Sequence, residues 1–521
     1  MGKTGAIASD VEGLRARVIA LDTALAERDS EIAQLREYIR LLRHQHFGAK
    51  SERIHRDQLG LFNEAEALAA KAPEPEEAPP VAVAAHPRTP RGRRALPAWM
   101  PREEILHDLP AAEKVCPHDG AALVEIARET SEQLEFIPAT ARVLVHVRPK
   151  YGCPTCKTGV HTAPLPSQPI PKSLATPSLL AYVAVSKYAD ALPLYRQEEM
   201  LGRLGIDLSR ATLAAWMVRA GALVQPLVTR MREEILASGF VQCDESRLQV
   251  LREPGKSAES LSYMWVQRGG SVDHPLILYE YDPSRSAEVP KRLFEGFRGV
   301  LQTDGYEGYG AVGREPGVVH VGCWAHARRK LIEALEAQGA SRKKRGQRKG
   351  GHSLADEGLG FFQDLYAIER RLRDATADER LAARRAESLP IVAALRAWLD
   401  RVLGTVVPQS LTGKAVAYLD GQWEKLVRVF DYGFVPLDTN LVENAIRPFA
   451  LGRKNWLFAD TVGGAEASAN LYSVVATAKA NHLEPWAYLQ HVFTELPRAN
   501  SFDDVDALLP DRVKIRGDVL R

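Results

Sequence analysis

Apolar residues near the N-terminus recur at alternating steps of four and three positions, which is the spacing of a coiled-coil seam. Eight of the nine seam positions are apolar, and Arg28 is the polar exception. The seam consists of Leu14, Val18, Leu21, Leu25, Arg28, Ile32, Leu35, Ile39 and Leu42. The pattern predicts a coiled coil over residues 10–50 that joins copies of the chain. A long helix packed on its own protein would show the same spacing.

A proline-rich stretch over residues 72–101 breaks this pattern and predicts an extended linker. It contains the basic run Arg88-Thr-Pro-Arg-Gly-Arg-Arg. Within that run, Arg91 and Arg93 are candidates for contact with a narrow A·T minor groove, where the potential of DNA is most negative. A run that is only solvated is the alternative.

Residues 102–170 combine cysteines with strand-like residues over 135–149, and they predict a small zinc-binding β unit. Cys153 and Cys156 have the two-residue gap that lets one turn present two thiolates to a tetrahedral Zn²⁺. Cys116 is the third candidate ligand. The candidates for the fourth ligand are His118, Asp119 and His161. The zinc would be structural, because so small a unit buries little core. A zinc-free hairpin with reduced thiols is the alternative.

Residues 172–237 have helical spacing. Leu192–Leu204 reads as an amphipathic helix, and Ser209 is a suitable N-cap for a second helix over Arg210–Ala220. Two helices joined by a glycine-containing turn fit a helix-turn-helix that binds DNA, although plain packing units look the same. The side chains predicted to face DNA are Arg210, Thr212 and Arg219.

Between residues 239 and 333 the spacing changes to that of strands. Three strands follow one another without a helix, and two more precede a helix over residues 325–337. The predicted strands are Val241–Cys243, Ser262–Gln267, Leu276–Tyr281, Gly299–Thr303 and Val318–Gly322. This order suits an RNase H-like core, so the predicted fold class is a multidomain α/β protein.

Acidic residues mark the ends of two predicted strands. Asp244 and Asp304 follow apolar runs, and a third acid, Glu443, lies where a helix is predicted to start. Carboxylates on neighbouring strand ends and a facing helix can hold two Mg²⁺ (or Mn²⁺) ions, as phosphoryl transfer requires, because such hard cations prefer oxygen ligands. Rival ligands remain open nearby: Glu245, Asp438 and Glu466.

The spacing of these acids predicts how the domains are divided. Asp304 follows Asp244 by 60 residues, but Glu443 follows Asp304 by 139 residues. We therefore expect a catalytic core over residues 239–340 and 435–480, a helical insertion over 341–434 and a C-terminal helical region over 481–521. The insertion opens with the basic, glycine-rich run 341–351, which either contacts DNA phosphate or is simply solvated.

Basic residues also follow Glu443. Arg447, Arg453 and Lys454 are candidates for holding DNA phosphate, with a solvated helix face as the alternative. Trp456 either stacks on an unpaired base or packs in the core, and core packing is the favoured interpretation.

Composition limits the function classes. The chain has 521 residues and a net charge of only +2, so a nucleic-acid surface must come from local clusters. Five cysteines give no even disulfide framework. No apolar run approaches the roughly 20 residues of a membrane span, and the N-terminus lacks a secretory signal. These observations favour a cytoplasmic, nucleoid-associated bacterial protein over secreted and membrane classes.

Taken together, the motifs resemble those of transposases of the insertion sequence 66 family, as the transposase C subunit of such an element. The resemblance extends from the zipper to about Pro497. The motifs that carry it are Phe47-Gly-Ala-Lys-Ser-Glu-Arg, Ser131-Glu-Gln-Leu-Glu, Val147-Arg-Pro-Lys-Tyr-Gly-Cys, Asp244-Glu-Ser, Thr303-Asp-Gly-Tyr-Glu-Gly-Tyr, Cys323-Trp-Ala-His-Ala-Arg-Arg-Lys and Glu443-Asn-Ala-Ile-Arg-Pro-Phe-Ala-Leu-Gly-Arg-Lys-Asn-Trp-Leu-Phe.

The resemblance implies a DDE transposase with an RNase H-like catalytic domain and the triad Asp244, Asp304 and Glu443. Such an enzyme binds transposon ends, cleaves phosphodiester bonds and joins the 3′-hydroxyl ends to target DNA. Family members often work with two small accessory proteins of the same element.

Two positions depart from the family pattern. The family often has a cysteine where Asp119 stands, and Asp438-Thr-Asn replaces its Asp-Asn-Asn before the last acid. Cys323 and His326 resemble a pair that follows the second acid in several DDE lineages, and we interpret them mainly as a structural pair, with a direct active-site role as the alternative.

Two other functions compete with transposition. One is a metal-dependent nuclease that cuts without joining. The other is a DNA-binding regulator with a zinc finger, a helix-turn-helix and no strand-transfer activity, against which the presence of all three acids argues.

Overall fold

The computed structural model describes residues 102–106, 114, 121–122, 133, 141–152, 160–337 and 353–513. The predicted coiled coil, the linker with Arg91 and Arg93, the zinc candidates Cys116, His118, Asp119, Cys153 and Cys156, and the basic run 341–351 all lie outside the described residues. The chain divides into two compact units, one made of Met1–Ala49 with Pro149–Arg521 and the other of Lys50–Arg148. The elements below belong to the first unit.

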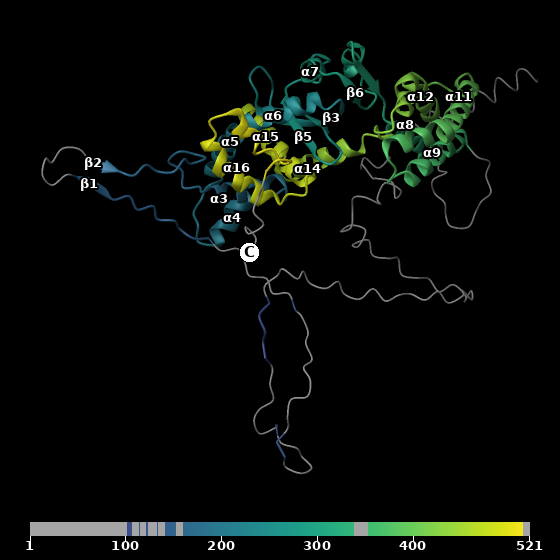
Figure 1. Ribbon diagram of the computed structural model, residues 1–521. Helices are drawn as coiled ribbons and strands as arrows, with labels where there is room; N and C mark the ends of the chain where they lie inside the picture. The colour runs from purple at the N-terminus through teal and green to yellow at the C-terminus, as the bar shows by residue number, and fades with distance from the viewer. Residues whose placement is uncertain are drawn as a thin grey trace, which may run out of the picture. The chain divides into compact units, whose positions relative to one another are not determined.

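A mixed β-sheet organises this unit (Figure 1). Its strands are β3 (Phe240–Arg252), β4 (Leu261–Gly270), β5 (Pro275–Asp282), β6 (Gly299–Gln302) and β7 (Val318–Val321), in the order β5-β4-β3-β6-β7. β3, β4 and β5 are antiparallel, whereas β6 runs parallel to both β3 and β7. The five predicted strands and the α/β class are therefore confirmed.

Strand β3 is longer than predicted, and Asp244 lies within it rather than at its end. The strand continues to Arg252 because Leu248 and Val250 are buried in the core at alternate positions. β4 pairs with β3 from Gln242 to Gln249, and the short β8 (Ala459–Thr461) pairs with Val250 and Arg252.

Edge strand β5 is covered by helix α15 (Val462–Ala480). The Thr477 hydroxyl accepts a hydrogen bond from the Ile277 amide (2.9 Å) and donates one to its carbonyl (3.0 Å). The Tyr279 amide donates to Ser473 Oγ at 2.8 Å. Side-chain hydroxyls of α15 thus satisfy backbone groups that an exposed edge would offer to another strand.

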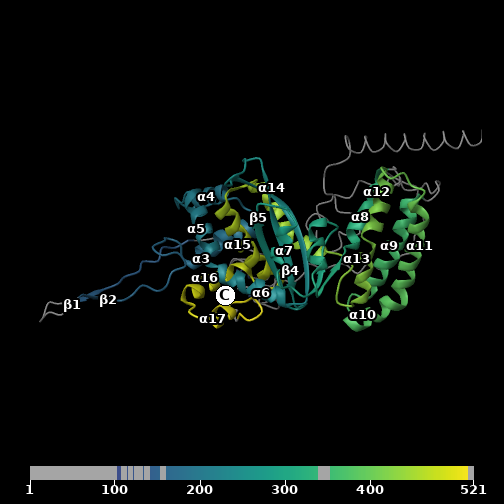
Figure 2. The ribbon, with the colours of Figure 1, turned by 90° about the horizontal axis from the view of Figure 1, so that it is seen from above.

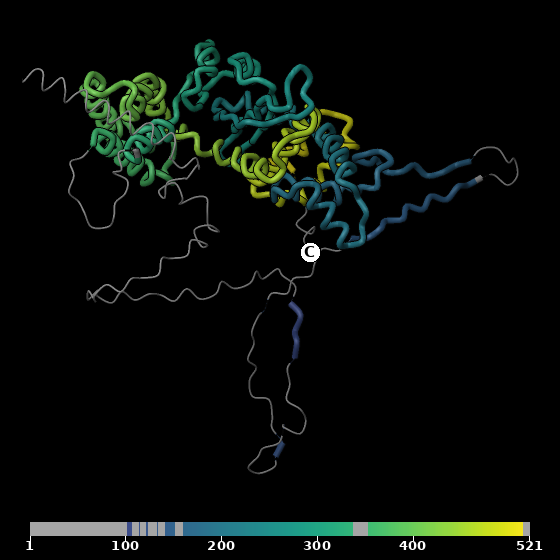
Figure 3. The backbone as a smooth tube through the Cα atoms, turned by 180° about the vertical axis from the view of Figure 1, so that it is seen from behind, coloured from purple at the N-terminus to yellow at the C-terminus, as the bar shows by residue number. Residues whose placement is uncertain are grey.

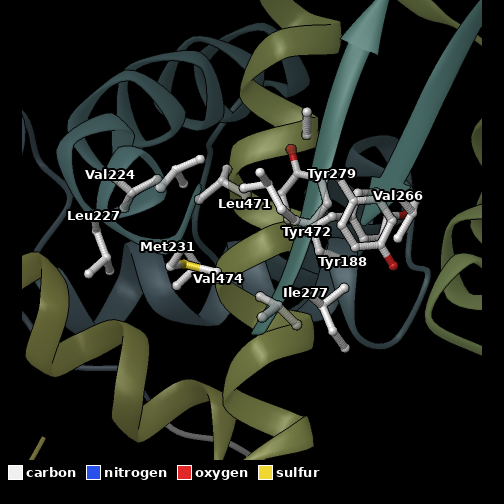
Figure 4. Close-up of a cluster of buried hydrophobic side chains, with 14 of the residues drawn as sticks. Tyr188, Val224, Leu227, Met231, Val266, Ile277, Tyr279, Leu471, Tyr472 and Val474 are labelled. Carbon is white, nitrogen blue, oxygen red and sulfur yellow. The ribbon is translucent and has the colours of Figure 1, made fainter. Parts of the chain in front are cut away.

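The main hydrophobic core lies between the sheet and helices from both ends of the unit. These are α3 (Pro177–Tyr188), α4 (Leu194–Arg203), α5 (Arg210–Leu223), α6 (Gln225–Ala237), α15, α16 (Pro485–Glu495) and α17 (Phe502–Asp506). Figure 3 shows the yellow C-terminal helices against the blue helices. Figure 4 shows Tyr188, Tyr279 and Tyr472 meeting within this core, with Leu471 and Val474 on α15 between the sheet and α6. The helices of residues 177–237 therefore share one core with the sheet.

A second hydrophobic cluster belongs to helices α8 (Trp324–Ala337), α9 (Leu354–Arg371), α11 (Leu389–Leu403), α12 (Leu411–Gly421) and α13 (Trp423–Val427), with α10 (Ala377–Ala383) beside them. Figures 1 and 2 show these helices grouped together, and Figure 1 shows the group next to β6. Arg384, in a π-helix over Arg384–Ser388, is fully buried there. Its guanidinium pairs with Glu369 and donates to the carbonyls of Val429, Tyr432 and Val435.

The predicted strand over residues 135–149 is wrong for its described part. Residues 141–149 form no strand, and Val143, Val145 and Val147 are exposed. Apolar alternation makes a strand only where a partner supplies a ladder, and here the ladder begins later. It joins β1 (Lys150–Gly152) to β2 (Val160–Thr162) in antiparallel register.

Within the described ranges, no single helix is long and apolar enough to cross a membrane. The bent pair α5 and α6 would pass that test together, by length and composition only.

Candidate active site

Asp244 lies on β3, and Asp304 lies just past the end of the neighbouring parallel strand β6. Gln242 on β3 is in register with Gln302 on β6, and each acid follows two residues later, as Asp244 and Asp304. Backbone amides orient both carboxylates. The Glu245 amide donates to Asp244 Oδ1 at 2.8 Å, and the Tyr306 amide donates to Asp304 Oδ1 at 2.9 Å.

The third acid projects from the first turn of helix α14 (Asn440–Trp456), which packs against β3 and β4. The Thr439 hydroxyl lies 3.3 Å from Glu443 Oε1 and can donate to it. Tyr279 on β5 donates its hydroxyl hydrogen to the Ala445 carbonyl and so fixes the start of α14 on the sheet. The prediction that Glu443 lies at a helix start is confirmed.

The negative charges of the other acids act on Asp244. The pKa of Asp244 is raised well above its usual 3.8, mainly by burial and further by the negative charges of Glu245, Glu443 and Asp304. Ionised carboxylates that lie close together away from water repel one another. A divalent cation bound between them would make the ionised forms favourable. The donors are all carboxylate oxygens, which suit Mg²⁺ or Mn²⁺.

Glu245 is occupied by other partners. Arg285 Nε donates to its Oε1 at 2.7 Å, and the Tyr309 hydroxyl donates to its Oε2 at 2.9 Å. Arg285 also lies over the Tyr306 ring, 4.0 Å from the ring centroid. A carboxylate with both oxygens hydrogen-bonded by protein is a poorer metal ligand than Asp244.

Asp438 precedes the N-cap of α14, Thr439, and both of its carboxylate oxygens are hydrogen-bonded by protein groups. The Asn440 amide donates to its Oδ1 at 3.2 Å, and the Tyr366 hydroxyl on α9 donates to its Oδ2 at 3.2 Å. Burial raises the pKa of Asp438 to about 6, against the opposing effect of these two hydrogen bonds. The third rival, Glu466, is exposed on α15.

Cys323 and His326 adjoin Glu443. One ligand atom from each of the three residues lies within 4.8 Å of the others, which is a spacing that could hold a metal ion. However, the Cys323 sulfur already accepts hydrogen bonds from the Thr439 amide (3.3 Å) and hydroxyl (3.2 Å). Burial raises the pKa of this thiol to about 12. A protonated thiol that ties α8 to the start of α14 fits the structural interpretation of the pair.

His326 and Arg329 flank the Glu443 carboxylate from helix α8. His326 Nδ1 lies 3.6 Å from Oε1, and Arg329 Nη2 lies 3.3 Å from Oε2. Sequence reasoning missed Arg329, although its position three residues after His326 places both side chains on one helical face.

The loop after Asp304 is closed by residues from the helical cluster. A Cβ added at Gly305 would lie 2.5 Å from the Tyr418 hydroxyl oxygen on α12, so any larger residue would displace the Tyr418 side chain. Thr303 Oγ1 hydrogen-bonds His320 Nε2 at 2.8 Å. The loop that carries Asp304 is therefore held on both sides.

The side chains predicted to face DNA from α5 do not share one face. Arg210 and Arg219 are both exposed, but they are separated by about two and a half helical turns and so point in opposite directions. Thr212 lies on the Arg219 side, and its hydroxyl is paired with the capping Ser209 at 3.0 Å. Contact of Arg210, Thr212 and Arg219 with DNA stays a prediction, and on a straight helix Arg210 would make it from the opposite face.

The basic residues of α14 divide into two groups. Arg453 donates to Ser246 Oγ at 3.4 Å and to the Arg247 carbonyl, so it holds α14 against β3. Arg447 is half-buried, and Lys454 is exposed. Trp456 packs against the core beside Phe449, with ring centroids 5.6 Å apart, as the favoured interpretation expected.

A family model described as "Transposase IS66 family" matches residues 172–467, which is more than half of the chain and includes all three acids. The chain belongs to the IS66 transposase family. Further models match other parts of this IS66 transposase. They are "zinc-finger binding domain of transposase IS66" over residues 113–157, "Transposase C of IS166 homeodomain" over 34–105 and "IS66 C-terminal element" over 473–510.

The zinc-finger match supports a structural zinc in this IS66 transposase, because it spans the cysteines from Cys116 to Cys156. Of the candidate ligands, His161 is the one within the described residues. It is exposed on β2, opposite Tyr151 in the ladder.

Curated relatives of this IS66 transposase come from Sinorhizobium fredii (strain NBRC 101917 / NGR234). "Uncharacterized protein y4jD" is 33% identical over 430 residues, covering 80% of this chain and 81% of the relative. "Uncharacterized protein y4qI" is 32% identical over 513 residues, covering 95% and 91%.

Proposed function

We propose that the chain is a DDE transposase that cleaves the phosphodiester bond at each transposon end and joins the freed 3′-hydroxyl to target DNA. The observation that carries this proposal is the placement of three acids: Asp244 on β3, Asp304 just past the end of the neighbouring parallel strand β6, and Glu443 in the first turn of α14, which packs against β3. Burial, followed by the negative charges of Glu245, Glu443 and Asp304, raises the pKa of Asp244, as expected where carboxylates lie close together. The strand order β5-β4-β3-β6-β7, with three antiparallel strands followed by two parallel ones, supports an RNase H-like core.

In this proposal Asp244, Asp304 and Glu443 hold two Mg²⁺ or Mn²⁺ ions. These ions would lower the pKa of the attacking oxygen and stabilise charge on the leaving oxygen. In cleavage, a water oxygen bonds to phosphorus and the bond from phosphorus to the 3′ oxygen breaks, which leaves a 3′-hydroxyl. In joining, that hydroxyl bonds to a target phosphorus and displaces a target 3′-hydroxyl. One phosphodiester replaces another, so joining needs no further energy source.

The protein's own contribution is positioning. Tyr279 and Thr439 fix the helix turn that carries Glu443, and backbone amides orient the other two carboxylates. A site held in this way needs little rearrangement before the phosphoryl group is transferred.

We further propose that DNA follows helix α14 away from the acids. Arg447 and Lys454 lie within about 40° of Glu443 around the helix, at rises of about 6 and 16 Å. A stripe of cations that leads from the acids would bind successive phosphates. Arg453 lies off this stripe and holds β3. The candidates for contact elsewhere on the DNA are Arg91, Arg93, Arg210, Thr212 and Arg219.

The zinc and partner assignments are also proposals at residue level. Cys116, Cys153 and Cys156, with one of His118, Asp119 and His161, would hold the structural zinc. Residues 10–50 would join two or more copies of the chain, since two DNA ends need two active sites. Reconstitution with and without the two small proteins of the element would show whether they are required.

The test uses DNA carrying both ends of the element with flanking sequence, the full chain and Mg²⁺. We expect cleavage with a free 3′-hydroxyl and joining of a pre-cleaved end to a target. Asp244→Asn should remove both activities but keep end binding, while the control Asp273→Asn, an exposed acid in the turn before β5, should keep all three. Cutting without joining would establish a nuclease instead. Cleavage unaffected by Asp244→Asn would overturn the assignment of the site.

A further inference from the structure

Two glutamines lie on the sheet just before the strand acids. Gln242 and Gln302 stand opposite each other in the parallel β3–β6 ladder, and each precedes its acid by two residues. Both are fully buried, with 0% exposure. Because residues two apart on a strand point to the same face, Gln242 and Asp244 occupy the same side of the sheet, and Asp304 follows Gln302 by two residues, just past the end of β6.

The two amides bond to each other and to the segment that leads into α14. Gln242 Nε2 donates to Gln302 Oε1 at 2.8 Å and to the Asp438 carbonyl at 3.0 Å. Gln302 Nε2 donates to the Pro436 carbonyl at 2.7 Å. The pair therefore joins β3, β6 and residues 436–438, which are the three pieces of backbone that carry Asp244, Asp304 and Glu443.

We propose that the Gln242–Gln302 pair is a positioning device for the metal site, which sets the spacing of the three carboxylates. The inference rests on the proposed function. Gln242 is joined to Asp244 by two residues of β3, and Gln302 is joined to Asp304 through Thr303, just past the end of β6. The path to Glu443 runs through Asp438, which precedes the N-cap of α14, and Thr439, whose hydroxyl reaches the Glu443 carboxylate.

The glutamine pair lowers the stability of the fold, and this is the reason to assign it a role. Gln242 Oε1 is buried without a hydrogen-bond partner, and an unsatisfied buried acceptor costs folding free energy. Apolar side chains of equal length would fill the same space without that cost. They would not fix the distance between two strands and a loop, as directional hydrogen bonds do.

The test replaces each glutamine with methionine, which keeps the length and removes the amide. Groups that orient metal ligands typically contribute about 10–100-fold to metal affinity or activity. We expect Gln302→Met to raise the half-saturating Mg²⁺ concentration for cleavage by roughly tenfold or more. Gln242→Met should change it in the same direction, because this variant removes the bonds to Gln302 and to the Asp438 carbonyl.

Gln267→Met is the matched control. Gln267 is also fully buried, but it pairs with Cys243 and so points to the opposite face. Both of its amide atoms lack a hydrogen-bond partner. Replacing it removes a buried glutamine without touching the glutamine pair, so Mg²⁺ dependence should stay at the wild-type value.

Metal binding is measured separately from activity. The full chain is titrated with Mn²⁺, and electron paramagnetic resonance reports the concentration of Mn²⁺ that stays free. Thermal unfolding without metal shows whether each variant is folded. Weaker Mn²⁺ binding in folded Gln302→Met, with Gln267→Met unchanged, supports the proposal. If Gln302→Met and Gln242→Met are both folded and both keep the wild-type Mn²⁺ affinity and Mg²⁺ dependence, the proposal is overturned.

Asp244→Asn distinguishes a failure of the proposed metal site from a failure of the positioning role. If this variant binds Mn²⁺ and cleaves like wild type, the metal site itself is wrong. If it loses both while Gln302→Met and Gln242→Met lose neither, the metal site stands and the positioning role is refuted.

Discussion

Asp438 provides a quantitative test of the site's electrostatics. The variant Asp438→Asn keeps an oxygen to accept from the Asn440 amide, because asparagine caps helices as well as aspartate does. Its amide can also donate to the Tyr366 hydroxyl. The variant removes only the charge that burial disfavours. The difference between the ordinary pKa of 3.8 and a value of about 6 corresponds to about 3 kcal/mol at pH 7, and partial exposure reduces this to ~1–2 kcal/mol.

The direction of the pH dependence of stability follows from proton binding. Between pH 3.8 and about 6 the folded state of the wild type holds more protons on Asp438 than the unfolded state does. The contribution of Asp438 to stability is therefore fully present below pH 3.8, the pKa of the unfolded state, and it is lost as the pH rises through about 6, the pKa of the folded state. Asp438→Asn should exceed the wild type in unfolding free energy at pH 7, and the advantage should fall below ~1 kcal/mol at pH 4.

Urea denaturation at both pH values measures the effect, with Asp431→Asn, an exposed acid in the same segment, as the control. A variant that is less stable than wild type at pH 7 would refute the reasoning, because the fold would then favour the ionised carboxylate. An advantage that does not change with pH would refute it too. Cleavage should persist well above the level of Asp244→Asn, and its complete loss would make Asp438 a metal ligand.

Three other predictions concern separate parts of the chain. Arg384→Met should lower the unfolding free energy by about 3–5 kcal/mol, because it strands the Glu369 carboxylate and three carbonyls; a loss under ~1 kcal/mol in thermal or urea unfolding would contradict this. Cys153→Ser should remove the bound zinc in metal analysis of the purified chain, and full zinc content would exclude that ligand. Lys454→Ala should reduce the salt dependence of DNA binding by about one charge in a titration series; an unchanged slope would place the DNA elsewhere.

Local pattern was enough to predict the elements that carry the acids. The apolar run before Asp304 ends with β6 as expected, and Glu443 lies in the first turn of its helix. Both predictions depend on neighbouring residues alone. The end of β3 was not predictable in this way, because the strand continues past Asp244 only where β4 and β8 supply partners.

The contacts between distant segments could not be predicted from the sequence. The hydrogen bond between Gln242 and Gln302 depends on the register of two strands whose paired residues are 60 positions apart. In addition, a glutamine within an apolar run is normally predicted to be exposed, although these two are buried. The bond from Tyr366 to Asp438 depends on how α9 packs. Likewise, Arg329 beside Glu443 follows from the placement of α8, which no spacing along the chain determines.

The most direct test of the account is a crystal structure of the chain with Mn²⁺, in which anomalous scattering locates the ions. We predict Mn²⁺ within about 2.0–2.3 Å of carboxylate oxygens from Asp244, Asp304 and Glu443 together. An ion held by Cys323 and His326 in their place, or Mn²⁺ that contacts none of the three acids, would contradict the claim that these carboxylates form one metal site.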